Sequence, residues 1–278
     1  MGSRTKWDPL GRIAWGLRVQ GRYLRIGFVR KSQFRWEFVN QVVMDVLFYV
    51  SFVLTFDILY GLGDGGLTLA GWTYEEMRVY LGMVFVADSL HMTFLGQQWH
   101  FGNDLKDGRL DSFRVRPGST AYLYFFQRFS PEGLTNLVLA VGWLVYALIG
   151  VVPEQVEPLS LLWTLPAALA VVAWSQAFLT IAYNVSEFWL THSDVGHLVQ
   201  TFVSTFGERP LEVYPSGLTR FLIFVLPVAG FGWYPASLVL GRLDPLFAAA
   251  YPLVLVAFAV GVVFVFRRGL ARYESALG

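Results

Sequence analysis

Hydrophobic residues in this chain gather into long runs that short polar segments separate. The first run extends from about Trp36 to Tyr60, the second from about Arg78 to Trp99, the third from about Ala121 to Gly150 and the fourth from about Leu159 to Asn184. A helix of roughly 20 apolar residues is long enough to cross the hydrocarbon core of a bilayer. The pattern therefore predicts four membrane-spanning helices over the first two thirds of the chain.

The sequence after Asn184 can be interpreted in two ways. Hydropathy alone places a fifth span at about Leu218 to Leu240. The other interpretation places a short fifth span at Val195 to Phe206, followed by a helical hairpin over about Tyr214 to Arg242 that enters the membrane from outside. Proline interrupts the hydrogen bonds of a helix, so the hairpin is favoured by Pro215, Pro227 and Pro235. Both interpretations end in a last span at about Leu246 to Phe266, and both give an all-α fold with six transmembrane helices.

The segment before the first span has a different pattern. From Asp8 to Lys31 apolar residues are interleaved with arginines, as in an amphipathic helix that lies flat on a membrane surface. Glycine weakens a helix, so we expect two short pieces or one bent helix because of Gly11, Gly16, Gly21 and Gly27. We therefore divide the chain into an interfacial N-terminal segment, 1–35, and one transmembrane domain, 36–278.

Charge sets the expected orientation. Nine Lys and Arg residues precede the first span, and by the positive-inside rule the N-terminus is cytoplasmic. The segments 61–76 and 151–158 carry acids without Lys or Arg and are expected outside, whereas 100–118 is basic and expected inside. Arginines also follow the last span. Both termini are therefore predicted to be cytoplasmic.

Composition supports these predictions and excludes several chemistries. Hydrophobic residues make up 55% of the chain and charged residues 15%, which is typical of an integral membrane protein. The chain has no cysteine, so disulfides, thiolate metal sites and cysteine nucleophiles are excluded. The glycine-rich Gly61 to Gly66 lacks the lysine of a P-loop, and no other nucleotide motif is present. We expect no metal site and no nucleic-acid partner.

Ionisable residues inside the predicted spans are candidates for function, because burying them in lipid is costly. Four residues qualify, and they are Asp45, Asp57, Asp88 and His91. Asp88 and His91 lie three residues apart on one helical face, so they can form a proton relay of a proton-coupled secondary transporter. The interpretation that we favour is a hydrogen-bonded contact between helices. Asp45, Asp88 and His91 form the candidate intramembrane polar site.

A second cluster raises the alternative of an intramembrane enzyme, and it contains His192, Ser193, Asp194 and His197. Sequence neighbours do not have the geometry of a catalytic triad by adjacency, and the chain has no GxSxG elbow. Two histidines five residues apart also lack the spacing of a helical zinc pair. A turn with a helix-capping Ser or Asp explains the cluster better.

The polar segment 100–118 has alternating charges around two apolar residues, Leu110 and Phe113. This pattern is compatible with a short amphipathic helix across the membrane plane, whose apolar residues fill a groove in a soluble partner while the charges pair around its rim. A solvated connecting loop is the alternative.

Two motifs in the chain resemble those of a known family. Gly108-Arg109-Leu110-Asp111, followed by Arg116-Pro117, resembles the "G-x-L-D … R-P" signature of the ABC-2 type permeases, in the branch of export permeases encoded with an ATPase and a second permease. A later pattern is similar to that branch as well, and it consists of Arg209-Pro210-Leu211, Tyr214-Pro215, Pro227, Tyr234-Pro235 and Leu240-Gly241. The similarity covers nearly the whole chain.

The resemblance implies roles for these two regions. The first would be a cytoplasmic coupling helix at about 104–116 that sits in a cleft of an ATPase subunit, with Lys106, Asp107, Gly108, Arg109, Leu110, Asp111, Phe113, Arg114, Arg116 and Pro117. The second would be an external re-entrant hairpin at about 210–242, with Pro210, Tyr214, Pro215, Pro227, Tyr234 and Pro235. The resemblance thereby favours the interpretation with a short fifth span at Val195 to Phe206.

The resemblance also implies a function. The chain would be the permease subunit of an ABC exporter in a bacterial cytoplasmic membrane, and it would move a hydrophobic or amphipathic substrate outward. It would have no catalytic site and no cofactor of its own, since Mg-ATP would be bound and hydrolysed by two copies of a partner ATPase. A second homologous permease would complete a heterodimer surrounded by membrane lipids.

Overall fold

The computed structural model describes residues 9–31, 35–61, 68–190 and 195–273. The regular structure in these ranges is helical, and a lone β-bridge joins Leu69 and Trp72. The described residues contain four helices that are long and apolar enough to cross a membrane. They are α2 (Arg35–Gly61), α7 (Pro131–Gln155), α8 (Leu161–Val185) and α12 (Pro245–Arg272). The all-α membrane fold is thus confirmed.

A bent pair of helices supplies a fifth candidate span. Helix α3 (Tyr74–Phe94) begins with a capping box, in which the side chains of Thr73 and Glu76 each accept a hydrogen bond from the other's backbone N–H. After α3 the chain bends by 56° into a 3₁₀ turn, η1 (Gly96–His100), and the short helix α4 (Phe101–Lys106). The described residues therefore provide four spans, or five if this bent pair counts as one.

The region after α8 contains short helices. Helix α9 (Val195–Gly207) has the bounds expected for the short fifth span, but its 13 residues extend only about 20 Å, less than the roughly 30 Å of hydrocarbon. A continuous helix over Leu218 to Leu240 is wrong, because the chain forms α10 (Ser216–Phe224) and α11 (Trp233–Val239) with a 3₁₀ turn, η4 (Val228–Gly230), between them. Pro227 precedes that turn and breaks the helical hydrogen bonds.

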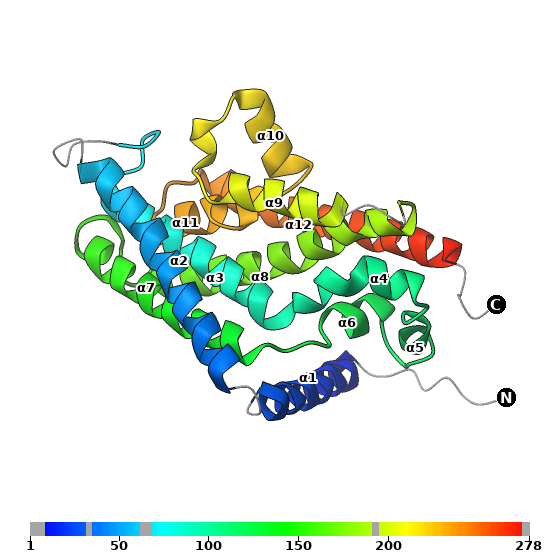
Figure 1. The fold of residues 1–278 in the computed structure, drawn as a ribbon. Helices are drawn as coiled ribbons and strands as arrows, with labels where there is room; N and C mark the ends of the chain where they lie inside the picture. The colour runs from blue at the N-terminus through cyan, green and yellow to red at the C-terminus, as the bar shows by residue number, and fades with distance from the viewer. Residues whose placement is uncertain (1–8, 32–34, 62–67, 191–194, 274–278) are drawn as a thin grey trace.

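The N-terminal segment forms one helix, α1 (Pro9–Lys31), so of the two expected forms the structure has a single helix and not two short pieces. Gly27 allows close packing here, since a Cβ at this position would lie 2.7 Å from the backbone oxygen of Phe129. The Tyr122 hydroxyl also donates a hydrogen bond to the Gly16 oxygen, at 3.4 Å. Helix α1 therefore packs on the segment that precedes α7 (Figure 1).

The helices bury two apolar clusters. The larger cluster lies between α3, α7, α8 and α11. The smaller one, which we call the α4–α6 cluster, includes Phe101, Leu110, Phe125 and Phe266, and it joins α4, α5 (Asp111–Arg114) and α6 (Thr120–Phe125) to the last part of α12. Figure 1 shows α4, α5 and α6 at one end of the molecule, beside the C-terminal end of α12, with α10 far from them.

Candidate functional site

The predicted coupling segment is divided into two short helices. Helix α4 ends at Lys106, the chain turns through Asp107 to Leu110, and α5 begins at Asp111. Gly108 has φ +70°, a conformation that residues with a side chain rarely adopt. The expected single amphipathic helix over 104–116 is therefore wrong, because the glycine reverses the chain in its middle. We call residues 107–110 the α4–α5 turn.

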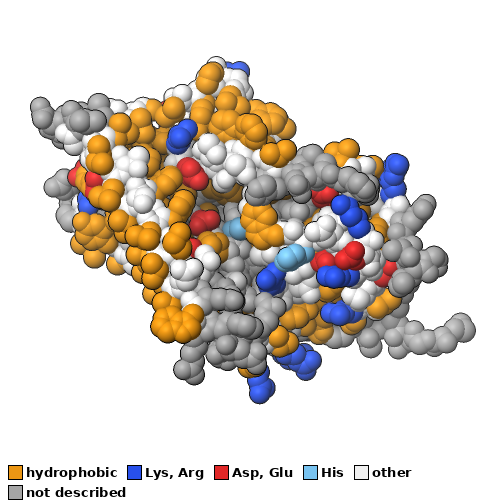
Figure 2. Space-filling view, in the orientation of Figure 1, with side chains coloured by type: hydrophobic (Ala, Val, Ile, Leu, Met, Phe, Trp, Pro, Cys, Tyr) orange, Lys and Arg blue, Asp and Glu red, His pale blue; other side chains and the backbone are white. Residues whose placement is uncertain are grey.

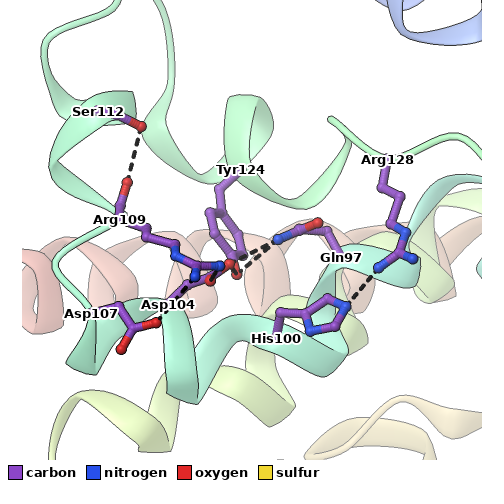
Figure 3. Close-up of polar contacts among 8 residues, drawn as sticks. All are labelled: Gln97, His100, Asp104, Asp107, Arg109, Ser112, Tyr124 and Arg128. Atoms are coloured by element: carbon purple, nitrogen blue, oxygen red, sulfur yellow. Dashed lines mark hydrogen bonds and ion pairs between the residues drawn. The ribbon is translucent and has the colours of Figure 1, made fainter. Parts of the chain in front are cut away.

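The carboxylate of Asp104 holds this turn in place. Asp104 is buried, and its Oδ2 accepts hydrogen bonds from Gln97 Nε2 at 2.8 Å and from the Tyr124 hydroxyl at 2.7 Å. Its Oδ1 accepts one from Arg109 Nη1 at 3.2 Å, and Arg109 also lies 3.4 Å from Asp107 (Figure 3). Burial and the bond to Asp104 raise the pKa of the Tyr124 hydroxyl. The turn, η1 and α6 thus share one buried carboxylate.

The two apolar residues expected to enter a partner have another role. Leu110 is fully buried and Phe113 is nearly so, and both pack in the α4–α6 cluster of this chain. Val115, in contrast, is 84% exposed. Val115 and its exposed neighbours form what we call the charged surface, which consists of Lys106, Asp107, Arg109, Ser112, Arg114, Val115, Arg116 and Pro117. The apolar residue free for a partner is therefore Val115.

Three contacts order Arg114 and Arg116 on the charged surface. The Arg116 guanidinium lies 4.7 Å above the ring of Phe113. Arg114 is 3.3 Å from Asp111 and also lies 5.8 Å from the ring centre of Tyr273, just after α12. Both side chains are largely exposed, so they present their charge outward while contacting the cluster beneath.

The candidate intramembrane residues line a hollow between helices. Asp45 on α2 and Asp88 and His91 on α3 face a compartment of about 630 Å³, together with Asn136 on α7 and Gln200 on α9. Figure 2 shows acidic and histidine side chains gathered in a hollow near the middle of the displayed face. We call this space the wide compartment. The structure thus brings all three predicted residues to one wall.

Each acid in the wide compartment has its own neutral partners. Asp45 accepts hydrogen bonds from Gln41 Nε2 at 2.9 Å and from Asn136 Nδ2 at 2.8 Å. Asp88 accepts one from the Tyr49 hydroxyl at 3.3 Å. Asp57, the fourth candidate, accepts one from the Tyr74 hydroxyl and does not line the compartment.

His91 lies in a separate network of amides. Its Nε2 is 2.7 Å from Gln98 Nε2 and 3.2 Å from Gln200 Nε2, and its Nδ1 is 3.4 Å from Thr180 Oγ1. Amide nitrogens donate hydrogen bonds, so these two glutamines suit an Nε2 that accepts. No hydrogen bond joins His91 to Asp88 in the described part of the chain. The network links α3, η1, α8 and α9.

A basic pair also lines the wide compartment. Arg128 Nη1 donates to His100 Nε2 at 2.6 Å (Figure 3), and both residues belong to the lining. Neither was among the sequence-predicted site residues. His100 belongs to η1, the turn that also carries Gln97 and Gln98, so the compartment and the α4–α5 turn share this short segment.

The predicted hairpin residues lie where the backbone changes direction. Pro210, Pro215 and Pro227 each directly precede a helical segment, and Pro235 lies in the first turn of α11. The Tyr214 ring packs edge-on against Phe206 at 5.2 Å, and the Tyr234 hydroxyl donates to the Ala248 oxygen at 2.6 Å. The hairpin is therefore fastened to α9 and α12.

Residues that sequence reasoning missed hold the hairpin to the start of α3. Glu212 accepts hydrogen bonds from Trp72 Nε1 at 3.2 Å and from Trp233 Nε1 at 2.8 Å. Arg242 lies 2.7 Å from Glu76 and 4.2 Å above the Trp72 ring. No local pattern marks these residues, because the partners are up to 170 positions apart.

The cluster proposed for an intramembrane enzyme falls mostly outside the described residues. His192, Ser193 and Asp194 lie in the range 191–194, which the structure does not describe. His197 belongs to α9, but its side chain is not described.

The helices and the two buried polar networks define the class of this protein as a multi-pass helical membrane protein. The family described as ABC-2 family transporter protein matches residues 42–276, so the chain belongs to that family. Members are transmembrane permease subunits that generally work with a separate ATPase subunit and are generally not catalytic themselves. Comparisons with curated proteins and with solved structures give no match.

Proposed function

We propose that this chain is the permease subunit of an ATP-driven exporter for a hydrophobic or amphipathic substrate. A separate ATPase, present in two copies, hydrolyses Mg-ATP, and a second homologous permease completes the transmembrane unit. The observation that carries the proposal is the charged surface, because it exposes four cationic residues and Val115 around a turn that hydrogen bonds to Asp104 hold in place. Exposed basic side chains around one apolar residue suit a groove with an acidic rim.

The same geometry supports a mechanical route from the ATPase to the membrane. Gln97 and Gln98 are neighbours in η1, and Gln97 donates to Asp104 whereas Gln98 contacts His91. A force on the α4–α5 turn therefore reaches both the bend between α3 and α4 and the amide network on α9. Rotation of η1 would change the width of the compartment between α2 and α9.

The proposal includes an orientation. The charged surface and both termini face the cytoplasm of a bacterial cell, and α10 and α11 form the re-entrant hairpin on the external side. Helix α9 is the fifth of six crossings, the hairpin follows it, and α12 is the sixth. Most of α2 is exposed, with 11% of its apolar window buried, which suits contact with lipid or with the second permease.

The proposal is tested by changing the charged surface while leaving the buried network intact. The double variant Val115→Asp and Arg116→Glu reverses charge and polarity at the proposed partner face. We expect the ATPase subunit to co-purify at least about five-fold less well, and the ATP hydrolysis of the complex to fall in proportion, because like charges then meet across the interface.

A matched control lies at the far end of the molecule. Val213→Asp with Arg220→Glu makes the same two changes at exposed positions near α10. This control should retain the ATPase subunit. Normal assembly and hydrolysis in the Val115 and Arg116 variant would refute the coupling role of the charged surface.

A further inference from the structure

A narrow compartment of about 80 Å³ adjoins the wide compartment. Both are lined by Phe48 and Tyr49 on α2, Asp88 and His91 on α3, and Gln200 on α9. The narrow compartment continues to Gln176 and Tyr183 on α8 and to Glu208 after α9. The two spaces therefore share five lining residues and form one cavity with a wide part and a narrow part.

Several buried polar atoms on this cavity have no hydrogen-bond partner among the described residues. They are Gln176 Oε1 and the Tyr183 hydroxyl in the narrow compartment, and Asn136 Oδ1 in the wide one. Gln176 is 7% exposed, Tyr183 is 4% exposed and Asn136 is fully buried. A buried polar atom without a partner is costly, so these atoms indicate a ligand that is absent from the structure.

The unpaired groups call for a hydrogen-bond donor. Asn136 Nδ2 donates to Asp45, which fixes its Oδ1 as an acceptor, and Gln176 Oε1 is an acceptor as well. Asp88 accepts one long hydrogen bond, 3.3 Å from the Tyr49 hydroxyl, and retains acceptor capacity on both oxygens. A ligand with several N–H donors would satisfy these groups.

Three carboxylates line the cavity, those of Asp45, Asp88 and Glu208, and no Lys or Arg lines the narrow compartment within the described ranges. Arg128 lines the wide compartment and donates to His100. Because the charged groups of the narrow compartment are carboxylates in an environment of low dielectric, a cation is favoured there and an anion is disfavoured.

Aromatic rings form much of the remaining wall, namely Phe48, Phe52, Phe85, Phe231 and Trp99. Ring faces attract cations and also pack against flat apolar groups. The wall thus suits a ligand whose body is aromatic or otherwise flat and apolar.

We propose that this cavity binds an amphipathic organic cation, with its N–H-bearing charged group at Asp88 and Glu208 and its apolar body against the aromatic wall. The inference rests on the proposed function in one respect, because only in an exporter is the bound cation the transported substrate. Binding itself requires neither ATP nor the partner subunits, so the two proposals can fail separately.

The test uses the full chain in nanodiscs of phosphatidylcholine, without ATPase and without nucleotide. The probe is 9-aminoacridine, a flat cation with N–H donors at neutral pH, and its fluorescence is titrated against protein. Acridine-9-carboxylate has the same ring system with a negative charge. Empty nanodiscs give the baseline for partition into lipid. We expect saturable binding of the cation and none of the anion.

Two single variants locate the charge. Asp88→Asn and Glu208→Gln keep the size of each side chain, and each should weaken binding of 9-aminoacridine by about ten-fold, because one favourable charge interaction is removed. The control is Asp57→Asn, which removes a carboxylate from α2 outside the cavity and should leave the affinity unchanged. Thermal unfolding of each variant checks its folding, and either cavity variant suffices if the other is unstable.

Three outcomes would overturn the inference. They are equal binding of the cation and the anion, unchanged affinity in both cavity variants, and an equal loss in Asp57→Asn. In the first two cases the unpaired polar atoms of the cavity are hydrogen-bonded to water and not to an organic cation. Normal assembly and ATP hydrolysis in the Val115 and Arg116 variant, with cation binding intact, would instead count against the proposed function alone.

Discussion

At the scale of single residues, Asp104 has the largest set of polar contacts at the α4–α5 turn. It is 4% exposed, and Gln97, Tyr124 and Arg109 all donate to it. A buried carboxylate is tolerated when donors surround it, and those donors in turn need the carboxylate. The same acid therefore stabilises the fold and holds the charged surface in shape.

Replacing this carboxylate should destabilise the protein. Asp104→Ala leaves the buried Tyr124 hydroxyl without an acceptor and removes the shorter hydrogen bond of the half-buried Gln97 amide, so we expect the free energy of unfolding to fall by about 3 kcal/mol. Asp107→Ala removes an exposed ion pair with Arg109 and should change it by less than about 0.5 kcal/mol. Thermal unfolding in detergent compares the two, and equal shifts would contradict a structural role for Asp104.

The pH dependence of stability should report on Tyr124. Burial and the bond to Asp104 raise its pKa in the folded state, whereas the unfolded chain ionises near pH 10. The unfolded state therefore loses this proton first, and stability falls as the pH rises above about 10. Tyr124→Phe cannot ionise, so its stability should be lower at neutral pH but decline less steeply above pH 10. A parallel decline in both proteins would contradict this prediction.

At the scale of helices, α1 shows how packing overrides local preference. Glycines weaken an isolated helix, yet α1 is continuous from Pro9 to Lys31, and Gly27 lets it approach the backbone of Phe129. The contact joins the amphipathic segment to the start of α7. A side chain at position 27 should therefore separate α1 from the start of α7.

This prediction has a matched control on the same helix. Gly27→Val should displace α1, because even a Cβ would lie 2.7 Å from the Phe129 oxygen, whereas Gly21→Val has nothing within 4 Å of its Cβ. We expect trypsin to cleave at the arginines of α1 several-fold faster in the Gly27 variant. Equal cleavage in both variants would show that α1 is held by other contacts.

At the scale of the whole molecule, the orientation in the membrane follows from the charges at its two ends. The charged surface lies at the end with α4 and α5, and α10 is distant from it (Figure 1). Basic segments remain cytoplasmic during insertion, so the two regions should lie on opposite sides of the bilayer.

The absence of cysteine makes this orientation directly measurable. Val115→Cys and Ser216→Cys each introduce one thiol at an exposed position. A membrane-impermeant maleimide added to intact cells should label Ser216→Cys and leave Val115→Cys unlabelled until the cells are opened. Labelling of Val115→Cys from outside would reverse the proposed topology.

The sequence by itself determined the long helices and the polar segment between them. The expected bounds of the first, fourth and last spans agree with α2, α8 and α12, because the length of an apolar run limits where a helix can lie in lipid. The motif around Gly108 indicated the ABC-2 family, which the match to residues 42–276 confirms. These features are local, so the chain alone reveals them.

Tertiary structure decided which side chains those features expose. Leu110 and Phe113 looked available to a partner, but they are buried because α5 folds back onto α6 and α12. The acceptor role of Asp104 depends on Tyr124, and the wall shared by Asp88 and Glu208 depends on how α3 packs near α9. Such contacts join residues 20 to 120 positions apart, and no periodicity within one helix specifies them.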